Sequence, residues 1–471
     1  MRRVSHPLLL VTLTGLLVTS AVAANALPRT PQRVSHRASQ LESQRAPRAW
    51  HDSHAVGHAD TIVVNDPIAR LQRRLDAGEA ALERDSTFGY LPALLKALNI
   101  PVSSQGLVFS RTSLQTDKIA PWAPRALYFN DDVYVGYVQE SHFLEIASID
   151  PNAGAVFYTL SQEPRARPQF TRETTTCLMC HQSKAATGGV PGVMVISTIA
   201  DRNGYPIVGV HSGTTTDQTP IAQRFGGWYV TGSTGPHGHA GNVVSPLLGH
   251  EVYDKQHYRE TFDMTAASTR TDLAGMFDSV PYLSRHSDLV ALMVLVHQTS
   301  VHNLITAAHD AATEYVRYDP AAAGGGRPAN TDAYVSESAV RMQRTIDLLV
   351  RGLLMVGEAA PMAPLRGTSG FAEEFARAGG PSAPRDGQGR SLRDLDLEHR
   401  LFKYPLSFLI YSDSFESMPL VARRAVYARL WQVFNGTDPD PEYQRIAPAD
   451  RAAMREILTA TKPEFAGLRP R

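Results

Sequence analysis

Cysteine usage is the sequence feature that most constrains how this chain folds. The 471 residues contain only two cysteines, and both lie in the stretch CLMCH at residues 177–181. A bond between two thiols so close in sequence closes a tiny loop and contributes little chain-entropy stabilisation. The fold must therefore be stabilised by hydrophobic burial. A chain of this length that is 43% hydrophobic supplies enough core for two to three domains or one elaborated domain.

The charge balance excludes one class of partner. Lysine and arginine together number 46, as do aspartate and glutamate. A neutral chain has no overall field that would attract nucleic acid or an anionic membrane. We therefore expect no nucleic-acid partner, and other partners must be inferred from individual sites.

The first residues resemble a targeting segment. Two arginines precede an apolar run from about Pro7 to Val22, and small residues follow up to Ala26. This layout predicts a secretory signal peptide over residues 1–26. An uncleaved anchor is the alternative, although the run is shorter than the ~20 residues needed to span a bilayer. We expect the body of the protein outside the cytoplasm, in the periplasm or secreted, with no membrane span after cleavage.

The remaining chain changes character along its length. Residues 27–60 are rich in Arg, Ser, Pro and His without apolar periodicity, which predicts a flexible spacer. Residues 61–160 predict short helices, the first from a cap at Asp66 to about Leu82, followed by a β-rich segment. Residues 161–283 hold the CLMCH stretch and a glycine-rich loop. Residues 284–471 predict a helical region, with long helices over 287–310 and 336–358. The expected fold class is therefore α+β, with an N-terminal β-rich part and a helical C-terminal half.

The CLMCH stretch meets the requirements of covalent haem attachment. Cys177 and Cys180 have the spacing that matches two vinyl groups on one porphyrin edge, and His181 is placed to reach the iron as the proximal ligand. A redox-active dithiol or a structural disulfide are the alternatives, although a glycine-rich loop follows the motif where a dithiol site normally opens a helix. A zinc site would need further cysteines. The sequence predicts one covalent haem c with its iron.

The segment resembles the attachment site of c-type cytochromes. The surrounding chain does not resemble the small all-helical class I cytochromes c. With FGGWYVTG (residues 225–232) and HRLFKYPLSFLIYSDSF (residues 399–415), the chain from about residue 66 onwards is similar to a family of large secreted bacterial proteins that have one CxxCH and no assigned reaction. The resemblance implies haem binding and an extracytoplasmic location, and it supplies no substrate.

The second axial position of the iron determines the chemistry. A second strong ligand closes the site for electron transfer, whereas an open position admits peroxide, oxygen or another small ligand. The sequence offers His239 on the glycine-rich loop and His297 and His302 on an apolar helix. The two helical histidines point about 140° apart, so they cannot both face one iron. Buried histidines are also common as core residues bonded to the backbone.

Trp228 has two interpretations as well. It could pack on the porphyrin, or it could belong to a strand whose aromatic side chains are buried in the core.

We therefore predict a periplasmic c-type cytochrome that transfers electrons to or from an unidentified redox protein. A protein that only carries electrons can be built from ~100 residues, so the larger size favours an additional pocket or docking surface. A haem enzyme of peroxidase or oxygenase type with an open sixth position is the alternative. A haem-based sensor or binding scaffold is a third interpretation.

Overall fold

The computed structural model describes residues 62–467, apart from residue 264, residues 266–268, residue 320 and residues 322–331. The described residues belong to one compact unit, Val56–Arg471. The predicted signal peptide and spacer lie outside the described residues. Within the unit an antiparallel sheet precedes a helical half, which confirms the predicted α+β class.

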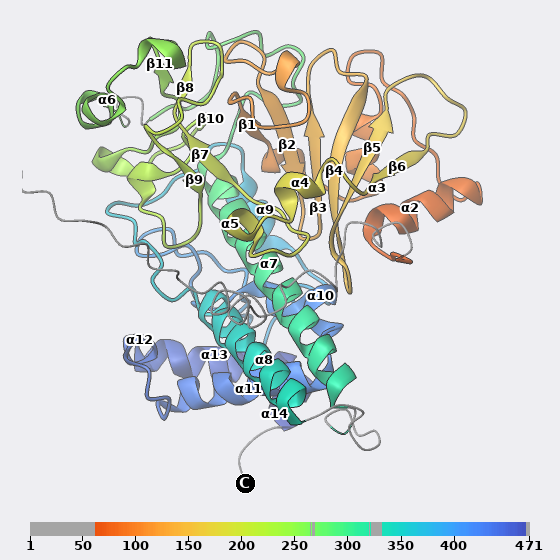
Figure 1. Ribbon diagram of the computed structural model, residues 1–471, viewed down its shortest axis with the longest axis vertical. Coiled ribbons are helices and arrows are strands. Elements are labelled where there is room, and N and C mark those ends of the chain that lie inside the picture. Colours follow the sequence, from red (N-terminus) through yellow and green to blue (C-terminus); the bar gives the residue numbers. More distant parts are fainter. Residues whose placement is uncertain (1–61, 264, 266–268, 320, 322–331, 468–471) are drawn as a thin grey trace, which may run out of the picture. The chain divides into compact units, whose positions relative to one another are not determined.

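A sheet of seven strands forms the centre of the first half among the described residues (Figure 1). Its order is β10-β1-β2-β3-β4-β5-β6, and every neighbouring pair is antiparallel. The strands are β1 (Gly106–Val108), β2 (Arg125–Phe129), β3 (Val133–Tyr137), β4 (Phe143–Asp150), β5 (Gly154–Ser161), β6 (Phe170–Glu173) and β10 (Trp228–Tyr229). The β-rich prediction is confirmed, and β6 and β10 extend the sheet with residues from beyond position 160.

Both faces of the sheet are covered. Side chains alternate between the faces, as the pleat of a strand requires. One face packs against helices α2 (Pro67–Asp76) and α3 (Leu91–Ala97). The other packs against helix α7 (Leu289–Tyr318), through side chains that include Phe129, Tyr134 and Ala147. The strands are therefore buried on both sides, which explains their nearly continuous hydrophobic sequences.

Helix α2 begins where the sequence predicts and ends earlier. The Asp66 carboxylate accepts hydrogen bonds from the backbone N–H groups of Ile68 and Ala69, and Pro67 occupies the first turn. The helix ends at Asp76, and Gly78 follows with a φ of 74°. Leu82, predicted as its last apolar position, is buried outside the helix.

Short elements connect the sheet to the helical half. They form two small sheets, in which β7 pairs with β9 and β8 pairs with β11, together with three short helices. Their bounds are α4 (Leu178–His181), α5 (Lys184–Thr187), β7 (Ile196–Thr198), β8 (Ala200–Asp201), β9 (Ser212–Thr214), β11 (Val244–Ser245) and α6 (Lys255–Thr261).

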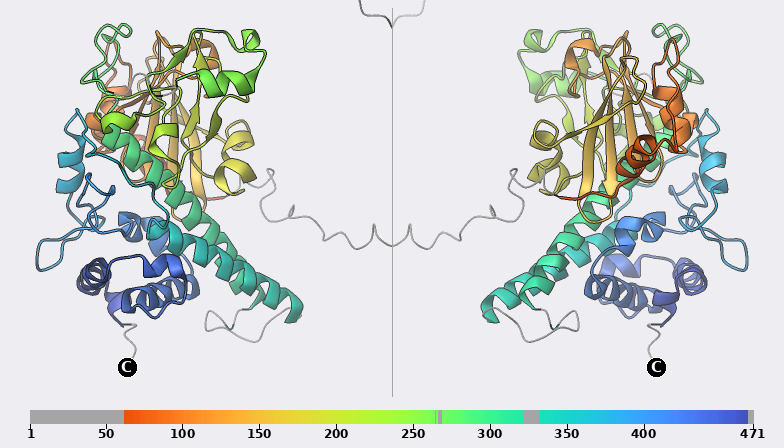
Figure 2. Two further views of the ribbon diagram at one scale, coloured as in Figure 1. Left: turned by 90° about the vertical axis from the view of Figure 1, so that its left-hand side faces the viewer. Right: turned by 90° about the vertical axis from the view of Figure 1, so that its right-hand side faces the viewer.

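Two long helices open the second half. Asp288 caps α7 by accepting hydrogen bonds from the backbone N–H groups of Val290 and Ala291. Helix α8 (Asp332–Leu353) packs along α7, and both extend away from the sheet (Figure 2). Both predicted helices are confirmed with shifted ends. Helix α7 begins two residues later and ends eight residues later than predicted, and α8 begins four residues earlier and ends five residues earlier. The others are α9 (Phe371–Arg377), α10 (Asp413–Glu416), α11 (Leu420–Asn435), α12 (Pro441–Gln444), α13 (Pro448–Thr461) and α14 (Pro463–Gly467).

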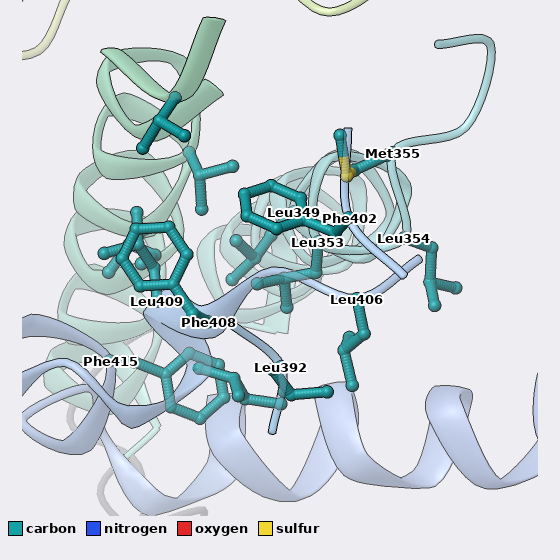
Figure 3. Packing of buried hydrophobic residues seen from close by; sticks show 14 of the residues in the cluster. Leu349, Leu353, Leu354, Met355, Leu392, Phe402, Leu406, Phe408, Leu409 and Phe415 are labelled. Carbon is teal, nitrogen blue, oxygen red and sulfur yellow. The ribbon is translucent and has the colours of Figure 1, made fainter. Parts of the chain in front are cut away.

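Helix α7 is the core helix of the unit. By length and composition alone it is apolar enough to cross a membrane, with a mean hydropathy of 1.4 over its best window. However, 83% of that window is buried against the rest of the protein. Leucine and phenylalanine side chains of the C-terminal segments complete this core (Figure 3). This burial is sufficient to explain the apolar sequence of α7.

Candidate functional site

The CLMCH stretch forms a single helical turn. The backbone N–H groups of Cys180 and His181 both donate to the Cys177 carbonyl, at 3.3 and 3.0 Å. Ser183 then caps the next short helix, α5, by accepting from the Ala186 N–H. Residues three apart in a helix share a face, so the two thiols lie on the same side of the turn.

The turn lies at the wall of a cavity of about 400 Å³, within the size range of small-molecule and cofactor sites. Cys177, Cys180 and His181 all line it. The other walls come from strands β2–β5, the segment 193–196, Trp228 of β10, and Leu295 and Thr299 of α7. Figure 1 shows the short helix α4, which carries the motif, in front of the sheet. The three residues singled out in the sequence thus meet at one cavity.

Trp228 lies where one of its two interpretations predicts, in a strand with buried aromatic side chains. It is buried in strand β10, where its indole N–H donates to the Ile196 carbonyl at 2.8 Å. It also lines the cavity.

His181 is oriented and kept neutral. Its Nδ1 lies 3.0 Å from the Gly192 carbonyl oxygen. Because a carbonyl only accepts, Nδ1 carries the proton and Nε2 keeps its lone pair. Burial lowers the pKa of His181, which favours the neutral ring, and the ring centroid lies 4.7 Å from that of Phe157. A neutral imidazole fixed through its other nitrogen is the form in which histidine binds a metal.

The carbonyl that orients His181 is itself held in place. The Gly192 N–H donates to the His181 carbonyl at 2.8 Å. On the next residue, the Asn303 amide of α7 accepts from the Val193 N–H at 3.1 Å and donates to the Val193 carbonyl at 2.8 Å. A Cβ on Gly192 would collide with the Asn303 side chain, so only glycine fits this approach. Helix α7 therefore indirectly positions the imidazole.

Cys177 does not have the lowered pKa of a reactive thiol. Both cysteines are free thiols, with Cys180 exposed and Cys177 half-buried. Burial raises the pKa of Cys177 to about 11, and the charges of Glu173 and Glu145 act in the same direction. Dithiol oxidoreductases need a thiolate with a lowered pKa. Among the described residues, no group of three or more His, Cys, Asp or Glu side chains is arranged to hold a bare metal ion.

One row of the sheet forms the cavity floor. Leu127, Gly136, Glu145 and Thr159 are register partners across β2, β3, β4 and β5, and all four line the cavity. The three atoms nearest to a Cβ on Gly136 would all belong to Glu145, at an ordinary 3.5 Å, and one of them is Oε2. The packing of the strands therefore does not require a glycine here. Its missing side chain leaves room for close approach of a flat ligand.

Polar groups lie at one part of this floor. Arg125 Nη1 donates to Glu145 Oε2 at 2.8 Å, and the Ser113 hydroxyl donates to Glu145 Oε1 at 3.2 Å. The Nε of Arg125 is buried and has no hydrogen-bond partner among the described residues. The cavity thus combines apolar walls with one charged pair.

The three expected sixth ligands do not line the cavity. His239 is buried near Phe225, and its Nδ1 accepts from the Gly241 N–H. His297 has Nδ1 at 2.8 Å from Asp217 Oδ2 and Nε2 at 2.8 Å from Ser407 Oγ, so both ring nitrogens are engaged. His302 Nε2 donates to the Asp131 carbonyl at 2.8 Å, and burial lowers its pKa to about 4. The structure brings none of them to the motif.

Several residues that sequence reasoning missed belong to the site. They are Arg125, Gly136, Glu145, Met194 and Asn303. A glycine inside the strand sequence VYVGY was a detectable signal, because strand interiors disfavour glycine. The partners of Arg125 and Asn303 lie 20 and 110 residues away in sequence and left no local pattern.

Comparison with protein-family models, with curated proteins and with solved structures gave no match. The function must therefore be argued from the geometry of the cavity.

Proposed function

We propose that this protein is a c-type cytochrome that holds one haem covalently in the cavity and exchanges electrons with a redox protein outside the cytoplasm. One observation carries the proposal: Cys177, Cys180 and an oriented, neutral His181 line the same cavity. A CxxCH stretch without a cavity beside it would have no room for a porphyrin. Here the motif lies at an apolar space with a glycine in its floor.

The residues fit a haem group. Cys177 and Cys180 would carry the two thioether bonds, and His181 Nε2 would bind the iron. Gly136 leaves space over the sheet, and apolar side chains would exclude water from the cofactor; these are Leu127, Phe157, Val193, Val195 and Leu295. When bound, haem supplies a one-electron Fe(III)/Fe(II) couple.

Exposure of the motif supports exchange with a partner protein. Met179 is 73% exposed and Cys180 is also exposed, although both line the cavity. The attached edge of the cofactor would therefore lie close to the protein surface. A redox protein that docks over residues 175–180 would approach the cofactor without rearrangement of the fold.

A second candidate function follows from the second axial position. His181 is the only imidazole among the described residues that line the cavity, and the lining thioethers belong to Met179 and Met194. If neither thioether binds, the iron keeps an open position, with Arg125 and Glu145 in the same cavity. That arrangement would support a haem enzyme of peroxidase or oxygenase type.

Covalent attachment is tested by expressing the full chain with a cytochrome c maturation system. We expect haem to stay with the protein through acid-acetone extraction, and the double variant Cys177→Ser/Cys180→Ser to lose it. Complete extraction from the wild-type protein would refute the proposal. His181→Ala should keep the attachment and change the visible spectrum, whereas His250→Ala, at an exposed histidine, should change neither.

Carbon monoxide separates the two functions. A reduced low-spin spectrum that CO does not alter is expected for a carrier with two axial ligands. A spectrum that shifts on addition of CO would favour the open-site enzyme and count against the carrier.

A further inference from the structure

We infer that the Nε–Nη2 edge of Arg125 is a carboxylate-binding subsite of the cavity, and that a haem propionate occupies it. The inference rests on the proposed function for the identity of the carboxylate. It names a ligand contact that the CLMCH motif does not contain. The observation behind it is a guanidinium whose Nε is buried and has no hydrogen-bond partner among the described residues.

Arg125 uses only some of its hydrogen-bond donors. A guanidinium has five N–H donors in one plane, arranged as a fork. Glu145 takes only the Nη1 group, at 2.8 Å. Nε is buried and has no partner among the described residues. A buried N–H without an acceptor is destabilising, so this edge favours an oxygen acceptor.

The free edge has the geometry that carboxylates prefer. Nε–H and the adjacent Nη2–H point in the same direction and match the two oxygens of a carboxylate. Glu145 does not fill this edge, because its second oxygen accepts from Ser113. An incoming carboxylate can therefore bind Arg125 while the existing ion pair persists.

Charge and position favour a propionate as this carboxylate. Arg125 is the only cationic side chain among the described residues that line the cavity. The motif packs at β5, where His181 contacts Phe157, and the Arg125 guanidinium lies at Glu145 of the neighbouring strand β4, with Nη1 2.8 Å from Oε2. In haem the propionates leave the porphyrin edge opposite the vinyl groups, so attachment at the cysteines directs them across the sheet.

The test compares haem with its dimethyl ester, which lacks the carboxylates. The full chain with Cys177→Ser/Cys180→Ser binds either compound reversibly, and the titration is followed by absorbance. A first variant adds Glu145→Gln to this chain and keeps Arg125. A second variant adds both Arg125→Gln and Glu145→Gln to this chain. It removes the guanidinium without leaving the Glu145 carboxylate unpaired.

We expect the loss of Arg125 to weaken haem binding roughly tenfold to a hundredfold relative to Glu145→Gln alone, and to leave ester binding within about twofold. Arg172→Gln, on the same sheet but outside the cavity lining, is the control and should change neither affinity. An equal loss for haem and ester, or no loss for either, would overturn the subsite. Thermal unfolding of each variant identifies a folding defect, and equal melting temperatures are expected for the two Gln variants.

Acetate distinguishes this inference from the proposed function. If the wild-type chain takes up no haem, the proposed function fails. Acetate binding that Arg125→Gln/Glu145→Gln abolishes would then still support a carboxylate subsite filled by a free anion. Haem and acetate affinities that are both independent of Arg125 would overturn the subsite.

Discussion

Replacing Gly136 with valine tests whether the cavity floor receives a flat ligand. Gly136 is the fourth of the five residues of β3, between its register partners Leu127 and Glu145. The three atoms nearest to a Cβ at this position belong to Glu145, at 3.5 Å, so the strand tolerates a Cβ in the absence of ligand. The added methyl groups would enter the cavity, because residue 136 lines it.

The substitution should change stability and haem content in opposite directions. Glycine in a strand costs roughly 0.5–1 kcal/mol relative to alanine, and valine favours strands. The haem-free chain should therefore gain about 0.5–1 kcal/mol in its free energy of unfolding. Haem content should fall, because the isopropyl group occupies the space that the porphyrin needs.

The assay measures covalent haem per chain after expression with the maturation system, and urea unfolding of the haem-free form. Gly213→Val is the matched control, because Gly213 lies in β9, has open space at its Cβ and does not line the cavity. It should keep the wild-type haem content. A Gly136→Val protein with full haem content and an unchanged spectrum would refute the role assigned to the floor.

Two further predictions concern Asn303, which indirectly positions His181, and the buried His302. Asn303→Leu removes both hydrogen bonds to Val193 and so loosens the neighbouring Gly192 carbonyl, which polarises His181. The reduction potential of the bound haem should therefore rise. An unchanged midpoint potential in a potentiometric titration would contradict this. The pKa of His302 falls to about 4 on burial, so its neutral form is favoured in the folded state and stability should decrease as pH falls from about 6.5 to 4. The free energy of unfolding should decrease by at most about 3 kcal/mol over this pH range. His302→Gln should flatten it in urea titrations, and an unchanged pH dependence would rule out this assignment.

The three candidate sixth ligands lie away from the cavity for a physical reason. A histidine in a core binds whichever polar group lies nearest, since an unpaired buried polar atom is costly. For His297 these groups are Asp217 and Ser407, which come from 80 residues before it and 110 residues after it. Residue type and helical spacing do not identify such partners. The same reasoning explains why the sequence did not identify Arg125 and Asn303 as residues of the site.

Local sequence determined the elements of this protein. Alternating and β-branched runs predicted the strands, Asp66 and Pro67 predicted the start of α2, and apolar periodicity predicted α7 and α8. The spacing of Cys177, Cys180 and His181 predicted a haem-attachment site, and this stays a prediction. These features depend on neighbours within one or two turns, so they can be read directly from the chain.

Only the tertiary structure decided what surrounds the motif. It placed the motif against the sheet, next to a cavity with Gly136 in its floor and Arg125 at its edge. It also directed His239, His297 and His302 to other partners. These outcomes depend on contacts between segments far apart in sequence, and the energy of each contact is set by the packing of the whole unit. No pattern within a short window records that packing, which is why the motif was predictable and its surroundings were not.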